Sequence, residues 1–205
     1  MHDHLSSALT EKIEVLTLVL DDETGNYAWA PSRKRWASVE LNTFQRTIFS
    51  DVGIGARGAT VVIRHDPKLT LHQAFRWNNQ FLFLTSVVLN QSRDRQEIKA
   101  AICEPVTLTA KPQAKTGRNT MNRPVVEQQG EFTFPGILTE LYHRNESDEI
   151  YRSETLQRVL VTPKAIKLRV ADLVQIGDEK PYVVRQVMDL DPYKNEYIIE
   201  RKEDV

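Results

Sequence analysis

The stretch Phe75-Arg76-Trp77-Asn78-Asn79-Gln80-Phe81-Leu82-Phe83-Leu84 places two runs of apolar and aromatic residues on either side of an asparagine pair. Aromatic residues favour strands, whereas asparagine tolerates the left-handed backbone that a tight turn requires. The stretch therefore predicts a β-hairpin, with Asn78-Asn79 as its turn.

Similar short runs, rich in β-branched and aromatic residues and bounded by Gly, Pro, Asn or Asp, occur along most of the chain. They predict a mostly β protein, with a small β-barrel followed by a second small β-rich domain. The expected strands of the first half are 12–20, 35–41, 59–65, 80–89 and 97–103. Those of the second half are 136–142, 157–161, 172–176, 182–187 and 196–200.

The second half contains a counterpart of the opening hairpin, in residues 174–184. Each hairpin is followed by a further strand, which begins near Gln96 in the first half and near Asn195 in the second. The similarity has two interpretations. The halves are related barrels in tandem, or two unrelated β-meanders look alike at this level of detail.

The chain is expected to divide at residues 104 and 131. Residues 105–130 contain three prolines and show no sustained period, which predicts a linker or an extended arm. Residues 1–104 carry 12 basic and 12 acidic side chains, the linker 4 and 1, and residues 131–205 carry 11 and 15. Because no domain is uniformly basic, the charge does not indicate a dedicated nucleic-acid binder.

Compartment and membrane signals are few. Cys103 is the single cysteine, which excludes an internal disulfide framework, and residues 1–12 lack a basic start and an apolar stretch. The longest apolar runs, 15–20 and 81–89, are shorter than the roughly 20 residues that span a bilayer. We therefore expect a protein that resides in the cytoplasm of the producing cell and makes no membrane contact.

No motif predicts catalysis, a cofactor or a metal. Gly53, Gly55 and Gly58 match the spacing of a dinucleotide-binding loop, but a strand follows where that loop requires a helix. The histidines are scattered, and residues 189–196 have Lys194 where a calcium loop requires glycine. Cys103 ends an expected strand with no partner that would activate it. We expect a protein that is not an enzyme.

The connection between two expected strands, residues 42–58, is unusually long. Loops of this length inside compact domains are usually functional or disordered, and its apolar residues argue against a solvated linker. Its candidate functional residues combine apolar, basic and glycine positions: Phe44, Arg46, Ile48, Phe49, Val52, Gly53, Ile54, Gly55, Arg57 and Gly58.

The order of these elements resembles the head-tail joining proteins of tailed bacteriophages, also called head-closure, head-completion or stopper proteins. The resemblance lies in the strand at 13–16, the turn ending at Tyr27, the strand Trp36-Ala37-Ser38-Val39-Glu40, the long loop, and the hairpin with its following strand. It covers residues 12–104. Typical members are single domains of about half this length, so residues 105–205 are additional.

The resemblance implies a ring in the virion neck, of six-fold or twelve-fold symmetry, assembled in the host cytoplasm. The ring would lie below the portal and adaptor proteins, close the DNA exit channel after packaging, and bind a tail completion or tail terminator protein. The loop 42–58 would form the channel plug, with its apolar residues against neighbouring copies and Arg46 and Arg57 facing the phosphates of packaged DNA without sequence preference.

Two further interpretations remain open. The residues Trp29, Arg33, Arg35 and Trp36 form either a subunit interface or a solvated turn that leads into a strand. The alternative function is a monomeric nucleic-acid-binding barrel of the OB type, with Phe75, Trp77 and Phe81 as stacking platforms. Against that function, the same aromatic residues would serve equally as core packing across a hairpin.

Overall fold

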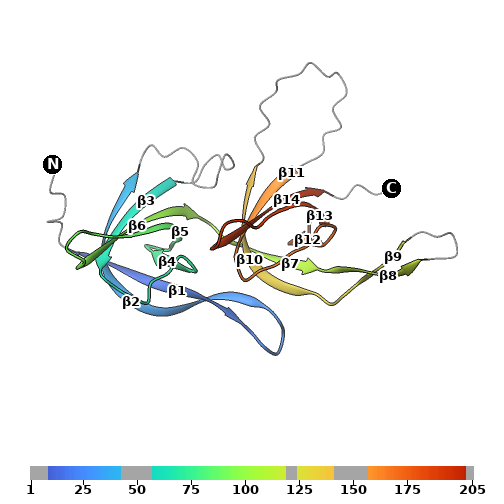
Figure 1. Cartoon of the computed structure of the whole chain (residues 1–205), viewed down its shortest axis with the longest axis horizontal. Helices are drawn as coiled ribbons and strands as arrows, with labels where there is room; N and C mark the ends of the chain where they lie inside the picture. Colours follow the sequence, from blue (N-terminus) through green and yellow to red (C-terminus); the bar gives the residue numbers. More distant parts are fainter. Residues whose placement is uncertain (1–8, 43–56, 119–123, 141–156, 202–205) are drawn as a thin grey trace, which may run out of the picture. The chain divides into compact units, whose positions relative to one another are not determined.

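The computed structural model describes residues 9–42, 57–118, 124–140 and 157–201, and all regular structure in these ranges is β-strand (Figure 1). Six strands close the first barrel in the order β1-β2-β3-β6-β5-β4. They are β1 (Glu11–Leu20), β2 (Tyr27–Asn42), β3 (Arg57–Arg64), β4 (Gln73–Trp77), β5 (Gln80–Leu89) and β6 (Arg95–Cys103).

A second barrel closes from six later strands in the order β10-β11-β14-β13-β12-β7. They are β7 (Val106–Lys111), β10 (Phe132–Glu140), β11 (Gln157–Pro163), β12 (Leu173–Ile176), β13 (Tyr182–Met188) and β14 (Lys194–Arg201). Strands β8 (Gln113–Arg118) and β9 (Pro124–Gln128) form a separate two-stranded sheet. The expected fold class, with two small barrels in a mostly β chain, is confirmed.

The unit boundaries differ from the expected ones. The first compact unit contains Met1–Val19 and Trp29–Glu104, and the second contains Leu20–Ala28 and Pro105–Val205. Within the expected linker or extended arm 105–130, β7 pairs with both β10 and β12 and is part of the second barrel wall, whereas β8 pairs with β9 alone. The turn around Gly25 also belongs to the second unit, in which Asn26 Oδ1 accepts a 2.6 Å hydrogen bond from the Thr133 backbone N–H.

The hairpin expected at residues 75–84 forms from β4 and β5. Phe75 pairs with Leu82 across β4 and β5, and both are buried in the core of the first barrel. Asn78 and Asn79 join the strands with φ of 47° and 62°. Both angles lie in the left-handed region, which asparagine adopts more readily than most residues.

The two barrels repeat the same architecture. Numbered along the chain within each barrel, the strands follow one order, and the β8–β9 sheet is inserted between the first two strands of the second barrel. Cross-strand pairs among β2 to β6 recur 99 or 100 residues later in the second barrel. Examples are Val61–Ile98 with Leu160–Tyr197, and Phe75–Leu82 with Val174–Tyr182. The bulge between Leu84 and Ser86 in β5 recurs between Val184 and Gln186 in β13.

A buried amide occupies the corresponding position in both barrels and holds the loop that precedes the hairpin. Gln96 accepts a 3.0 Å hydrogen bond from the Asp66 N–H and donates one of 3.3 Å to the Asp66 carbonyl. Asn195 donates to the carbonyls of Lys164 and Ile166, at 3.2 and 2.7 Å. The two barrels share their strand order, their pairing register, a bulge and a buried amide that holds a loop. These features favour two related barrels in tandem over a chance similarity of two meanders.

Candidate functional site

The long connection expected to carry function lies mostly outside the described residues. This applies to Phe44, Arg46, Ile48, Phe49, Val52, Gly53, Ile54 and Gly55. Its two ends are described. Arg57 is exposed at the start of β3, and Gly58 is buried and pairs with Asn42 at the end of β2. The connection therefore starts and ends on neighbouring antiparallel strands of the first barrel.

The four residues of the expected subunit interface all lie on β2, which begins at Tyr27, so the alternative of a solvated turn is wrong. Three of these residues have partners within the first barrel, and the fourth is largely exposed. The Trp29 ring packs against Phe81, with ring centroids 5.6 Å apart, and the Arg33 and Arg35 side chains bind Asp66. Trp36 is 54% exposed. The interface assignment itself stays a prediction.

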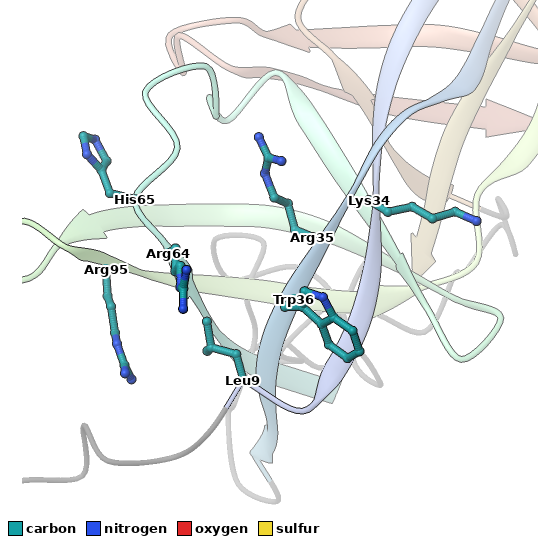
Figure 2. A pocket seen from close by; sticks show the side chains of 7 residues that line it. All are labelled: Leu9, Lys34, Arg35, Trp36, Arg64, His65 and Arg95. Carbon is teal, nitrogen blue, oxygen red and sulfur yellow. The ribbon is translucent and has the colours of Figure 1, made fainter.

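Trp36 borders a pocket of about 680 Å³ in the first barrel. Figure 2 shows the side chains that line it, which come from the start of β1, from β2, from the end of β3 and the loop after it, and from β6. They are Leu9, Lys34, Arg35, Trp36, Arg64, His65 and Arg95. Four of them are permanent cations and none is a carboxylate, which makes the pocket electropositive.

Strand pairing places the basic residues together. Arg64 and Arg95 are cross-strand partners in β3 and β6, so two guanidinium groups start from neighbouring strands. Like charges at such positions repel each other in the absence of a counter-charge. In the described part of the chain, Arg64 is exposed and forms no ion pair, and Arg95 lies 3.9 Å from an Asp94 oxygen. An anion in the pocket would supply the counter-charge that Arg64 lacks in the described residues.

Asp66 organises the side of the pocket that Arg35 lines. Its Oδ2 accepts hydrogen bonds from Arg33 Nε at 2.9 Å and from Arg35 Nη2 at 3.0 Å, and its Oδ1 accepts one from the Lys68 N–H at 3.0 Å. Burial alone would raise the pKa of Asp66, but these three donors outweigh it and the pKa is lowered. One ionised carboxylate therefore holds two arginines, and a positive charge remains.

The Trp36 indole adds an aromatic surface to this charge. Lys12 on β1 places its Nζ 4.9 Å from the ring centroid, in cation–π geometry. More than half of the Trp36 surface is nevertheless accessible. The arrangement as a whole can bind an anion and offer a ring face to a planar group.

The cysteine and the buried aromatic residues considered in the sequence analysis do not form a reactive or binding site. Burial raises the pKa of Cys103 to about 12, which keeps the thiol protonated at neutral pH. Phe75, Trp77 and Phe81 are at most 9% exposed, so the stacking platform proposed for the alternative function is wrong and the core interpretation holds. Within the described ranges, no three His, Cys, Asp or Glu side chains converge as metal ligands, and no helix is long and apolar enough to cross a bilayer.

The sequence did not predict this pocket, although two of its lining residues, Arg35 and Trp36, belong to the expected subunit interface. The run of residues 33–36 was noticed for its mixture of basic and aromatic side chains, whereas Arg64, His65 and Arg95 carried no signal of their own. The 30 or so residues between Arg64 and Arg95 contain a complete hairpin, and only the β3–β6 pairing brings the two together.

No family model and no curated protein matches this chain. Among solved structures, a chain described as "Virion of native gene transfer agent (GTA) particle" is similar to part of it, at 16% sequence identity. The alignment covers 45% of this chain and 92% of that chain, with a TM-score of 0.35. This likeness is weak and supports neither a family nor a function.

Proposed function

We propose that this chain is a structural protein of a phage-type virion neck. It forms a ring below the portal and adaptor, closes the DNA exit channel after packaging, and presents a surface for tail attachment. Support comes from the resemblance of residues 12–104 to head-closure proteins. The observation that carries the proposal is the position of the long connection, which leaves the first barrel at Asn42 on β2 and returns at Gly58 on the adjacent β3.

This position suits a channel plug. Both ends of the connection are fixed in a closed barrel, where Asn42 and Gly58 are cross-strand partners. A ring of such barrels would present one connection per copy to a common axis, because cyclic symmetry repeats every surface element around it. The apolar residues of the connection, among them Phe44 and Ile54, would then meet their symmetry mates.

The first test concerns partners. The purified chain, mixed with DNA-filled heads that carry portal and adaptor, is expected to co-sediment with them and to form a ring visible by electron microscopy. Heads that lack the adaptor serve as the control and should retain little of the chain. Equal retention on both kinds of head, or on neither, contradicts the proposal.

The second test concerns the plug. Deletion of Phe44–Ala56 with a short glycine replacement should leave the ring intact but allow packaged DNA to escape, measured as nuclease-sensitive DNA. Replacement of residues 119–123 by a glycine-serine stretch of equal length is the control and should retain DNA. Full DNA retention by the deletion variant removes the plug assignment while leaving the neck assignment to the first test.

A further inference from the structure

We propose that the electropositive pocket of the first barrel binds the phosphodiester backbone of single-stranded nucleic acid, with Trp36 stacking on an unpaired base. The inference concerns the isolated chain and does not depend on ring formation, so it goes beyond the proposed neck function. It is carried by the three basic residues Lys34, Arg64 and Arg95 in the pocket lining, which among the described residues contains no carboxylate.

The dimensions fit a short polymer segment. A pocket of about 680 Å³ is within the range of sites that hold small-molecule ligands. Lys12, Trp36, Arg64 and Arg95 start from the successive wall strands β1, β2, β3 and β6. Neighbouring strands lie about 4.8 Å apart, so this row extends over about 14 Å. Several cations along one line match a chain of phosphates better than a single small anion.

Within this row, the charge arrangement leaves Arg64 without an ion pair among the described residues. Asp66 has its bonds to Arg33 and Arg35, and so does not neutralise Arg64. In the described ranges, Arg64 has no carboxylate within ion-pair distance, and the Lys12 ammonium is directed at the Trp36 ring. A phosphate would therefore give Arg64 a charge-assisted contact without breaking an ion pair of that residue, and would lie close to the neighbouring Arg95 guanidinium.

The exposed indole favours a single strand over a duplex. Base stacking on an aromatic side chain contributes about 1–3 kcal/mol and requires an unpaired base. Trp36 combines 54% exposure with neighbouring cations, whereas the barrel's other two tryptophans, Trp29 and Trp77, are partly or fully buried against their own barrel. Sequence preference should be weak, because these contacts recognise a phosphate and a ring face and no base edge.

Fluorescence anisotropy with a labelled 12-nucleotide oligo(dT) and the full chain tests the proposal. At 50 mM salt the dissociation constant should lie in the micromolar range typical of non-specific binding, about 1–100 μM. With three or four phosphate contacts, log K should fall with log salt at a slope of about −2 to −3. A 12-base-pair duplex should bind more weakly. Absence of binding to the single strand at 50 mM salt overturns the proposal.

Variants locate the site. The double substitution Arg64→Ala/Arg95→Ala should weaken binding at least tenfold and bring the salt slope closer to zero by about 1.4, the contribution of two contacts. Arg64→Lys/Arg95→Lys keeps both charges and should restore most of the affinity, which excludes misfolding as the cause. The control Arg185→Ala/Arg201→Ala removes two exposed charges from the second barrel. An equal loss in this control refutes a localised site.

Two further measurements test base stacking and the class of ligand separately. Trp36→Ala should weaken single-strand binding about fivefold or more and leave duplex binding nearly unchanged. Equal effects on both, or tighter binding of the duplex, would exclude stacking. A polyglutamate peptide with the same charge should compete poorly. If it displaces oligo(dT) at equal charge concentration, the pocket recognises an acidic protein segment and the nucleic-acid assignment is wrong.

Discussion

In the first barrel Arg64 pairs with Arg95, and the corresponding pair in the second barrel is Pro163 with Lys194. The pairing register is the same, yet the side chains have different chemistry. Pro163 carries no charge, and the Lys194 ammonium lies 2.5 Å from a Glu196 carboxylate oxygen. The electropositive pocket is therefore a feature of one barrel that the shared fold does not require.

Side chains at corresponding positions of the two barrels differ less in chemistry where they point into the core than where they point outward. Val61 corresponds to Leu160 and Ile98 to Tyr197, all fully buried, and the larger Tyr197 ring keeps its hydroxyl bonded to the Ile166 carbonyl and the Leu168 N–H. A buried position must fill the same space and satisfy every polar atom, whereas an exposed position on the same strand is free of both requirements. The barrel fold therefore constrains the residues of the core and leaves the surface residues free to acquire separate functions.

The largest test of this comparison asks whether the two barrels unfold separately. Phe134→Ala removes a fully buried ring from the second barrel and should lower its free energy of unfolding by about 3–5 kcal/mol. Trp29, Trp36 and Trp77 all belong to the first unit, so tryptophan fluorescence reports on that unit alone. We expect an unchanged fluorescence transition in urea and an earlier transition by circular dichroism.

Phe75→Ala is the matched variant, because Phe75 is a fully buried ring of the first barrel. It should move the fluorescence transition by a similar amount. If Phe134→Ala shifts the fluorescence and circular dichroism curves equally, the two barrels unfold as one cooperative unit. Separate free energies of unfolding could then not be assigned to them.

A second test compares the buried amides that support the corresponding loops. Asn195→Ala removes the side-chain donor of the Lys164 carbonyl and one of the two donors of the Ile166 carbonyl. Gln96→Ala removes the acceptor of the Asp66 N–H and the donor of the Asp66 carbonyl. Each substitution should destabilise its own barrel by about 1–3 kcal/mol, the cost of unsatisfied buried groups. A negligible effect of one and a large effect of the other, in the same two-probe urea experiment, would show that the amides are not equivalent.

A third test uses pH, because Asp66 has no acidic counterpart in the second barrel, where Ala165 takes its position. Its folded pKa is lowered below the ordinary value of about 3.9, so ionisation stabilises the folded state. That contribution is complete above the ordinary pKa and is lost as pH falls through the lowered folded pKa. Asp66→Asn should therefore destabilise the first barrel at pH 7.

The acid range provides the check on this assignment. In fluorescence-detected urea curves, the difference between wild type and Asp66→Asn should shrink steadily below about pH 4, where both side chains become neutral. A difference that persists unchanged at pH 2 would mean that packing or hydrogen-bond geometry at this position, and not the carboxylate charge, stabilises the loop.

The smallest expected effects are at the two bulges. Thr85 Oγ1 donates a 3.0 Å hydrogen bond to the Lys99 carbonyl, and Arg185 forms an ion pair with Glu200. Both contacts are solvent-exposed, so Thr85→Ala and Arg185→Ala should each cost about 1 kcal/mol or less. Raising the salt concentration should reduce the Arg185 effect only, since screening acts on charges. A larger cost at either site would show that the bulge depends on its side chain.

Residue preferences alone located many of the strands and turns, although no strand was expected in β7, β8 or β9 and β2 begins at Tyr27, before its expected start at residue 35. The expected strand 80–89 coincides with β5, and the Asn78-Asn79 turn has the left-handed angles that its residue type favours. Residue preferences and turn chemistry are local properties, so they can be recognised along the chain. The similarity between residues 75–84 and 174–184 indicated two hairpins, but left open whether they are related.

Strand neighbours, in contrast, become known only from the folded chain. The three-dimensional structure assigned β7 to the second barrel although residues 105–130 had the composition of a linker, and it brought Arg64, Arg95 and Trp36 to one pocket. Barrel closure joins residues far apart in sequence, and the free energy that selects those pairs comes from burial and register summed over the whole barrel. No local pattern contains that sum, so the pocket could not be predicted from its separate residues.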